Sequence, residues 1–445
     1  MYIFPKHLYS DVRIETVKKT DISVKNGLLS ANRTRNETGA LVRVYDGRRW
    51  YYSAVSDLAS VQSEIDALAA MAEPNSDILN DPVVSLMETN TGRVFRYEAT
   101  DLSLISNERK MEVLNSYIPA IVECPEFTMW RPIYSDNHTV KRIISSKGTD
   151  VEFDTQNCAV SIRGMISVDE KPTPILFDVY KMVFDELGGR QEELQNHIKE
   201  VVDYAKNAVP VVPGDYTCVL SPEVAGVFAH ESFGHKSEAD FMVGDETMMR
   251  EWKLGSKVGS SILSIRESGG IEGSGYVPYD DEGTAAKDNY LIKDGVLVGR
   301  LHSGVTAASL GESLTGNARS IGFEYEPIVR MTTTYIDKGT DTKEQLISGV
   351  KRGIYIADLS HGSGMSTFTI APLRAYMIED GRITTPVKVS VISGNVMETL
   401  GQIDGLSDSV QICSFALGGC GKMEQFPLRV GFGGPYVRVN NIKVQ

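Results

Sequence analysis

The segment 229–241, AHESFGHKSEADF, carries two histidines and a glutamate whose spacing is typical of a metal site. His230, Glu231 and His235 form the pattern H-E-x-x-x-H, one residue longer than the H-E-x-x-H of many zinc peptidases. Imidazole nitrogens bind zinc, and a neighbouring carboxylate can take a proton from water. The pattern therefore favours metal-dependent hydrolysis, although from the spacing alone a pair of unrelated helix-face residues fits equally well.

The extra residue between the histidines requires a distorted helix. At 100° per residue, His230 and His235 lie about 140° apart on a regular α-helix, so their rings could not bind one ion. A π-bulge, which makes residues i and i+5 neighbours, or a break at Gly234 would bring both rings to one side. We therefore expect the helix to distort or end at Phe233-Gly234.

A catalytic zinc site needs a third protein ligand and one open position. Cys420 stands between glycines that allow close approach of the backbone, and Lys422 would favour its thiolate. An isolated cysteine is more often a small buried hydrophobic residue, but the glycines favour a ligand here. Glu238 could also orient a ligand, or belong to a solvated face. The candidates for the third ligand are Cys420, Glu238, Asp240 and His302.

Three further segments are polar enough to contact a substrate. The turn Tyr279-Asp280-Asp281-Glu282-Gly283 holds three carboxylates, which form either a self-capping acidic loop or a wall of the site. Asn317 and Arg319 could bind substrate or simply make a tight turn. His302 is a candidate oxyanion stabiliser, although a lone histidine is more often structural.

The elements around these residues indicate an α+β fold. Ser221-Pro222-Glu223 is a good helix start, with a capping hydroxyl, a proline in the first turn and a carboxylate near the dipole. Pairs such as Asn26-Gly27 and Asp46-Gly47 predict hairpins, as do Asp294-Gly295 and Asp380-Gly381. Apolar residues at three- and four-residue steps predict helices beginning at Ser56 and spanning about 107–118, 191–208 and 343–350.

The predicted organisation has three parts. A small N-terminal β-sheet and helix domain spans 1–105, and a mixed α+β middle region spans 106–210. The Pro-Val-Val-Pro-Gly segment at 210–214 cannot continue a helix and indicates a boundary. A strand-rich C-terminal domain that carries the metal site then spans 211–445.

Composition narrows the function classes. The chain has 445 residues and a net charge of −14, which opposes phosphate backbones and argues against direct nucleic-acid binding. Five cysteines without C-x-x-C spacing indicate a reduced compartment rather than a disulfide framework. Neither a signal-peptide pattern nor an apolar run long enough for a membrane span is present. We expect a cytoplasmic protein that does not interact with membranes.

Five ordered motifs give the chain a resemblance to the TldD/PmbA proteins, a family of zinc metallopeptidases and their paralogues. These proteins are associated with peptide maturation and were once described as modulators of DNA gyrase. The resemblance extends over nearly the whole chain. The motifs are AHESFGHKSEADF at 229–241, GSGYVPYDDEGT at 273–284, LTGNARS at 314–320, RMTTTYIDKG at 330–339 and GGCGKMEQFPLRVGFGGP at 418–435.

The resemblance implies a site and an assembly. In the family, two motif histidines and a late cysteine bind one zinc. These ligands map onto His230, His235 and Cys420, and the motif glutamate maps onto Glu231. Paralogous partner subunits lose these residues, so this chain resembles the catalytic type. The resemblance also implies a dimer, of identical or paralogous subunits. Met423-Glu424 departs from the expected glycine-rich C-G-K-x-G-Q pattern.

The favoured hypothesis is a zinc-dependent peptidase for unstructured peptides, with Glu231 as general base. A strand-rich domain around the metal suggests that an extended peptide docks by pairing with a sheet edge. One alternative is a non-catalytic paralogous subunit with a vestigial site, and a second is a zinc hydrolase for small amides. Fe²⁺ and Mn²⁺ remain alternative metals, although a thiolate with two imidazoles suits zinc. The natural peptide and the cleavage preference cannot be read from the sequence.

Overall fold

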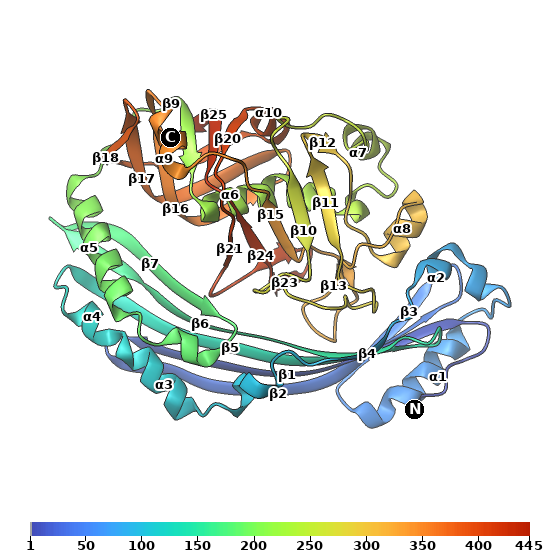
Figure 1. Cartoon of the computed structure of the whole chain (residues 1–445). Coiled ribbons are helices and arrows are strands. Elements are labelled where there is room, and N and C mark those ends of the chain that lie inside the picture. Colours follow the sequence, from blue (N-terminus) through green and yellow to red (C-terminus); the bar gives the residue numbers. More distant parts are fainter. Residues whose placement is uncertain (1) are drawn as a thin grey trace.

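The computed structural model describes residues 2–445 and has two main layers. A long curved sheet, coloured blue to green in Figure 1, runs beneath a C-terminal unit coloured green to red. The concave side of the sheet faces that unit, and helices lie against its outer side and ends. This arrangement, with a strand-rich C-terminal region, confirms the predicted α+β class.

The long sheet has the strand order β3-β2-β1-β5-β6-β4, with β7 beside β6. The predicted turns at Asn26-Gly27 and Asp46-Gly47 join β1 to β2 and β2 to β3. Its strands are β1 (Tyr9–Lys25), β2 (Leu28–Tyr45), β3 (Trp50–Val55), β4 (Thr91–Val94), β5 (Phe127–Ser145), β6 (Asp150–Val168) and β7 (Lys171–Lys181).

Amphipathic helices cover the sheet where the apolar periodicity predicts them. Val61, Ile65 and Leu68 of the first helix are buried against β1 and β2. Helix α5 buries Leu194 and Ile198 in a core shared with β5, β6 and β7. The helices are α1 (Val61–Met71), α2 (Pro82–Leu86), α3 (Asn107–Ser116), α4 (Ile118–Val122) and α5 (Gln191–Asn207), and the short 3-10 turns are η1 (Leu58–Ser60), η2 (Ile78–Asn80), η3 (Glu98–Thr100), η4 (Leu102–Leu104) and η5 (Phe184–Leu187).

The long sheet continues across the predicted boundary at residue 105. Strand β1 pairs with β5 from Asp11–Ser145 to Ser23–Ile133, so strands from both sides of that position share one sheet. The division into 1–105, 106–210 and 211–445 stays a prediction about domain limits.

The C-terminal unit begins with a closed ring of strands. β16 pairs with β9, β9 with β25, β25 with β19, β19 with β17, and β17 with β16 again. Asp380-Gly381 makes the predicted turn between β17 and β18. The strands are β8 (Val209–Pro210), β9 (Gly214–Leu220), β16 (Arg352–Gly364), β17 (Thr367–Glu379), β18 (Arg382–Lys388), β19 (Ile392–Asn395), β20 (Ile403–Leu406) and β25 (Val437–Val444).

A second sheet of this unit has the order β12-β11-β10-β15-β24-β21. Two short ribbons, β13–β14 and β22–β23, lie outside it. The strands are β10 (Ile265–Ser268), β11 (Asp288–Lys293), β12 (Val296–Leu297), β13 (Ala318–Arg319), β14 (Ile328–Val329), β15 (Thr333–Ile336), β21 (Gln411–Ser414), β22 (Cys420–Lys422), β23 (Gln425–Leu428) and β24 (Gly431–Gly434).

Helix α6 (Pro222–Ala229) lies between the ring and the second sheet. Its residues pack in one apolar core with strands of both. The backbones approach so closely that a Cβ on Gly226 would lie 2.4 Å from the backbone nitrogen of Gly433. The remaining helices are α7 (Glu246–Glu251), α8 (Gly304–Leu310), α9 (Lys343–Ser348) and α10 (Val396–Gly401). None of the helices in residues 2–445 combines the length and hydrophobicity needed to cross a bilayer.

Candidate metal centre

The end of α6 has the distortion that the histidine spacing requires. The helix begins at Ser221, whose hydroxyl accepts a hydrogen bond from the backbone N–H of Val224 at 3.4 Å. After Ala229 the chain forms a π-helical turn, η6 (His230–Gly234), followed by a 3-10 turn, η7 (His235–Ser237). The prediction of a distorted helix at Phe233-Gly234 is confirmed. The two imidazole rings consequently face one another, with centroids 5.1 Å apart.

Strand β22 brings a thiol to these rings. The Sγ atom of Cys420 lies 3.5 Å from Nε2 of His235, although the two residues are 185 positions apart in the chain. One possible ligand atom from each of His230, His235 and Cys420 lies within 4.8 Å of the other two. His230 and Cys420 are buried and His235 is partly buried, so the three donors converge at the edge of the core.

The electrostatics of the cluster favour a thiolate. Burial alone would raise the pKa of the Cys420 thiol, but the His230 and His235 rings hold that pKa well below its ordinary value. Burial likewise opposes protonation of His235, yet its contacts with Cys420 and Glu238 raise its pKa to about 10. A divalent cation would bind the thiolate and the neutral rings, and would displace the protons that the rings hold in its absence.

These residues fit a zinc ion. One thiolate and two imidazoles are ligands that zinc accepts, and three protein ligands leave a position open. Nδ1 of His235 lies 3.1 Å from Oε2 of Glu238, which directs Nε2 toward the cluster. Within the described part of the chain, the buried Nδ1 of His230 has no hydrogen-bond partner. The cluster therefore retains donor capacity that the protein itself does not use.

Glu231 is the second residue of the π-helical turn, and it lies against strand β16. A Cβ added to Gly362 would lie 3.3 Å from Cγ of Glu231, and one on Gly364 would lie 2.6 Å from its carbonyl oxygen. Burial raises the pKa of the Glu231 carboxyl, and the positive rings of His230 and His235 oppose part of that rise. The side chain is only partly buried, so part of it is accessible to solvent.

The other candidates for a third ligand have different partners. Glu238 is fully buried and accepts from both His235 and Lys422, whose Nζ lies 3.1 Å away. Asp240 forms an ion pair with Lys422 at 2.7 Å. The expectation that Lys422 favours the Cys420 thiolate is not met, because the lysine neutralises these two carboxylates and donates to the carbonyl of Val329. The two histidine rings have that role instead.

The three predicted substrate-binding residues lie outside the cluster. Nε2 of His302 contacts Glu312 and its Nδ1 contacts Thr306, at 3.0 and 3.2 Å. Asn317 donates to Glu267 and to the carbonyl of Arg330. Each therefore has a structural partner, and a contact of His302 or Asn317 with substrate stays a prediction.

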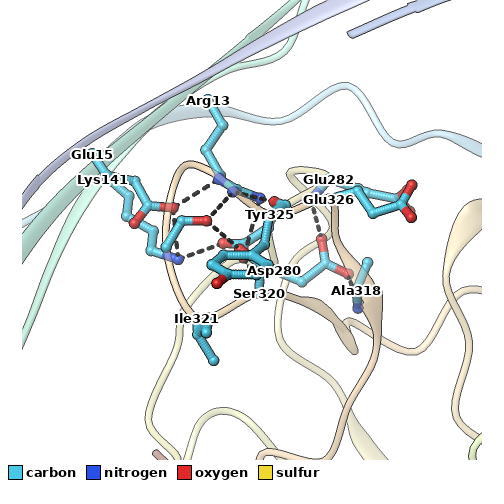
Figure 2. A network of polar contacts seen from close by, with 12 residues as sticks. Arg13, Glu15, Lys141, Asp280, Glu282, Ala318, Ser320, Ile321, Tyr325 and Glu326 are labelled. Carbon is cyan, nitrogen blue, oxygen red and sulfur yellow. Dashed lines mark hydrogen bonds and ion pairs between the residues drawn. The ribbon is translucent and has the colours of Figure 1, made fainter. Parts of the chain in front are cut away.

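Asp281 joins the C-terminal unit to the long sheet. Its carboxylate accepts from Lys141 of β5 at 2.7 Å and lies 3.4 Å from the Arg13 guanidinium of β1. It also accepts from the backbone and hydroxyl of Ser320, in the network that Figure 2 shows. A cavity of about 580 Å³ opens beside this network, lined by both layers. A role for Asp281 in binding substrate there stays a prediction.

Two features of the site have no signal in the sequence that could have revealed them. The glycines of β16 lie beside Glu231 because the strand ring closes, which depends on pairing between distant segments. The Arg330 side chain donates to the carbonyl of Cys420, 90 residues further along the chain, at 2.8 Å. Only the folded chain brings these residues together.

Comparisons with known proteins identify the family of the chain. The family model described as PmbA/TldA metallopeptidase C-terminal domain matches residues 213–445, and the model of domain 1 matches residues 10–73. A metalloprotease of Synechocystis is 30% identical, covering 98% of this chain and 94% of the relative. A zinc metalloprotease TldD homolog of Saccharolobus solfataricus is 26% identical, covering 98% and 96%.

Solved structures share the fold. The crystal structure of TldE from Thermococcus kodakarensis matches with a TM-score of 0.78 at 19% identity, covering 98% of this chain and 96% of that one. A putative modulator of a DNA gyrase from Thermotoga maritima matches with a TM-score of 0.74 at 18% identity, with the same coverage. The family models and the relative at 30% identity show that this chain belongs to the PmbA/TldD family of metallopeptidases.

Proposed function

We propose that this protein is a zinc-dependent peptidase that hydrolyses unstructured peptides, with one Zn²⁺ per site held by His230, His235 and Cys420. The observation that carries the proposal is the convergence of these three side chains around donor atoms within 4.8 Å of one another. The adjacent carboxylate of Glu231 supplies the remaining catalytic group. The zinc metalloprotease of S. solfataricus supports the choice of metal.

The chemistry follows from the positions of these groups. Bound zinc supplies Lewis acidity, which acidifies water and polarises a scissile carbonyl. Glu231 takes a proton from the attacking water and then delivers it to the leaving amine. Burial raises the pKa of its carboxyl, which makes the carboxylate a stronger base than an exposed glutamate. Glu238 holds His235 in the tautomer that presents Nε2.

An extended peptide fits the strand next to Glu231. Strand β16 pairs with β9 only from Gly353 to Ile356, whereas its pairing with β17 continues to Gly364. Within the described residues, the second half of β16 therefore has one edge without a strand partner. A peptide paired to this edge would be bound through main-chain hydrogen bonds, with little sequence choice. Folded proteins would be poor substrates.

The remaining parts of the proposal concern assembly and location. We propose a homodimer or a heterodimer with a paralogous subunit, in the cytoplasm and without direct contact to nucleic acid. The chain retains His230, Glu231, His235 and Cys420, which favours a catalytic subunit over a non-catalytic one.

Metal analysis with a cleavage assay tests the function. We expect the purified protein to hold one zinc per chain and to cleave a reduced, alkylated and fully unfolded protein. Cys420→Ala should lose both zinc and activity. Glu231→Gln should keep zinc while its kcat/KM falls by about 10²- to 10⁴-fold, the usual contribution of a general base.

Cys413→Ala is the matched control, because Cys413 lies seven residues earlier in β21 and pairs with Phe432 instead of the metal cluster. It should retain both zinc and activity. The absence of stoichiometric zinc from the wild type, or unchanged cleavage by Glu231→Gln, would overturn the proposal. Cleavage of small amides without cleavage of peptides would favour the alternative hydrolase.

A further inference from the structure

The ribbon that carries Cys420 is too small to hold its own position. Strands β22 and β23 span three and four residues and pair only with each other within the described chain. A two-stranded ribbon is marginally stable at best in water. Other groups must therefore fix the distance between the sulfur and the histidine rings.

Arg330 ties both strands of this ribbon together. Its guanidinium is completely buried and donates to the carbonyl of Cys420 at 2.8 Å and to that of Gln425 at 3.2 Å. The rigid guanidinium fork suits two acceptors at a fixed separation. The Arg330 backbone is itself fixed on both sides, because its N–H donates to Asn317 and its carbonyl accepts from the Asn317 amide.

The next residue contacts the other half of the site. Met331 is fully buried against the π-helical turn, where a Cβ on Gly234 would lie 2.1 Å from its sulfur. Arg330 thus contacts the cysteine ribbon, while Met331 contacts the π-helical turn at Gly234, the residue before His235. Two consecutive residues therefore contact the two segments that carry the candidate ligands.

Gln425 connects the ribbon to the loop 320–326, which we call the clamp loop. The Oε1 atom of Gln425 accepts a hydrogen bond from the backbone N–H of Ile321 at 3.2 Å, and the Nε2 atom of Gln425 donates to the carbonyl of Glu326 at 2.9 Å. The side chain is only 5% exposed, so water competes little for these hydrogen bonds.

The long sheet holds the clamp loop from the opposite side. Arg13 of β1 donates to the carbonyls of Gly322 and Tyr325, both at 2.9 Å. Figure 2 shows this guanidinium between Glu15 on its own strand and the loop that carries Ser320 and Tyr325. Arg13 is 1% exposed, and Glu15 pairs with it at 2.7 Å. A series of hydrogen bonds, part-buried at the clamp loop and buried at Arg330, therefore runs from the long sheet to Cys420.

We propose that Arg330 and Gln425 are positioning residues for the metal ligand Cys420, and that Arg13 makes metal affinity depend on docking of the long sheet. This inference rests on the proposed zinc site. None of the three side chains ligates the metal; they act by fixing the backbone that presents the sulfur. Residues that orient a ligand in this way commonly contribute 10- to 100-fold to metal affinity.

Zinc affinity, measured by competition with a chelator, tests the proposal on the full-length protein. Arg330→Lys keeps the charge but loses the fork, and we expect about 10- to 100-fold weaker zinc binding. Gln425→Ala removes only a side chain and should weaken binding about 10-fold. Arg13→Lys, which reaches the ribbon only through the clamp loop, should also weaken zinc binding.

Arg438→Lys is the matched control, because this arginine donates to Asp404 and to the carbonyl of Leu346 and has no contact with the ribbon. Its zinc affinity should stay within about twofold of the wild type. Circular dichroism establishes that each variant is folded, and Gln425→Ala decides the question if Arg330→Lys does not fold.

The Co²⁺-substituted protein separates this inference from the proposed function. A thiolate-to-Co²⁺ charge-transfer band that Cys420→Ala abolishes would establish the ligand, and in Arg330→Lys this band should shift or weaken. Wild-type affinity and an unchanged band in folded Arg330→Lys and Gln425→Ala would overturn the positioning role while leaving the metal site intact. The absence of a Cys420-dependent band in the wild type would overturn both.

Discussion

Lys422 is a buried charge beside the proposed metal site that is not one of its proposed ligands. Its ammonium is 3% exposed and lies within ion-pair distance of Glu238 and Asp240. Glu238 in turn orients His235, so the lysine keeps a carboxylate ionised next to a ligand. The sequence predicts that Lys422 favours the thiolate, whereas its ammonium contacts Glu238, Asp240 and the carbonyl of Val329.

Replacing Lys422 by methionine tests this role. The variant leaves Glu238 and Asp240 without their shared counter-charge, and loss of one partner from a buried pair typically costs about 3–5 kcal/mol. We expect Lys422→Met to lower the free energy of unfolding by about 3 kcal/mol, measured by urea denaturation at pH 7. Lys338→Met is a control on a lysine for which the structure shows no ion pair. A change below about 1 kcal/mol in Lys422→Met would contradict the assigned role.

Glu223 gives a pH-dependent prediction. Burial, followed by the negative charges of Asp358 and Asp178, raises its pKa from 4.5 to about 7 in the folded protein. The folded state therefore binds this proton more tightly than the unfolded state, and stability is lost as pH rises from about 4.5 through 7. Glu223→Gln removes the ionisation. We expect the variant and the wild type to be similar at pH 5, and the variant to be more stable by roughly 2 kcal/mol at pH 8. A difference in unfolding free energy that does not depend on pH would contradict this.

The sequence predicts residue types at the site better than residue partners. His230, His235 and Cys420 could be selected because thiol and imidazole chemistry is specific and the histidine spacing is local. The partners of His302 and Asn317 could not be predicted, because Glu312 and Glu267 become their respective neighbours only when the chain folds. A polar residue in a turn gives no indication of whether it will bind substrate or another part of the protein.

At the scale of elements, local signals explain the hairpins and the π-helical turn. Asp-Gly and Asn-Gly pairs determine tight turns that span only four residues. The five-residue spacing of the histidines requires a distorted helix if both rings are to bind one ion. The ring of strands has no such signal, because Gly353 pairs with Thr217 across 136 positions. The continuation of the long sheet past residue 105 has no local signal either, because β1 pairs with the distant strand β5.

Gly234 is the position at which the π-helical turn is most sensitive to substitution. A Cβ there would lie 2.1 Å from the sulfur of fully buried Met331. Gly234→Ala should lower the free energy of unfolding by about 2 kcal/mol, the usual cost of overpacking a core. In a Met331→Ala background, where that space is free, the same change should cost less than about 1 kcal/mol. Equal costs in both backgrounds would show that the packing against Met331 is not the cause.

At the scale of the whole molecule, buried charges join the long sheet to the C-terminal unit. Asp281 contacts Lys141 and Arg13, and its neighbour Glu282 lies 3.3 Å from Arg43 of β2. Figure 2 shows Arg13, Lys141 and Glu282 of this group between the layers. Opposite charges at fixed positions favour one orientation of the two layers. The contacts between Arg13 and the clamp loop depend on that orientation. The acidic turn is therefore an element of docking between the two layers.

Asp281→Asn tests that docking. Burial opposes ionisation of Asp281, but Lys141 and Arg13 hold the pKa of its carboxyl well below the ordinary value, so its stabilising effect is present at neutral pH and lost on acidification. We expect the variant to lose about 3 kcal/mol of unfolding free energy at pH 7, with the difference from the wild type narrowing at low pH. Asp150→Asn removes an exposed ion pair with Arg142 from the same sheet and should cost less than about 1 kcal/mol. If both substitutions had the same small effect, the two layers would be held by apolar contacts, and the charged network would contribute only to their orientation.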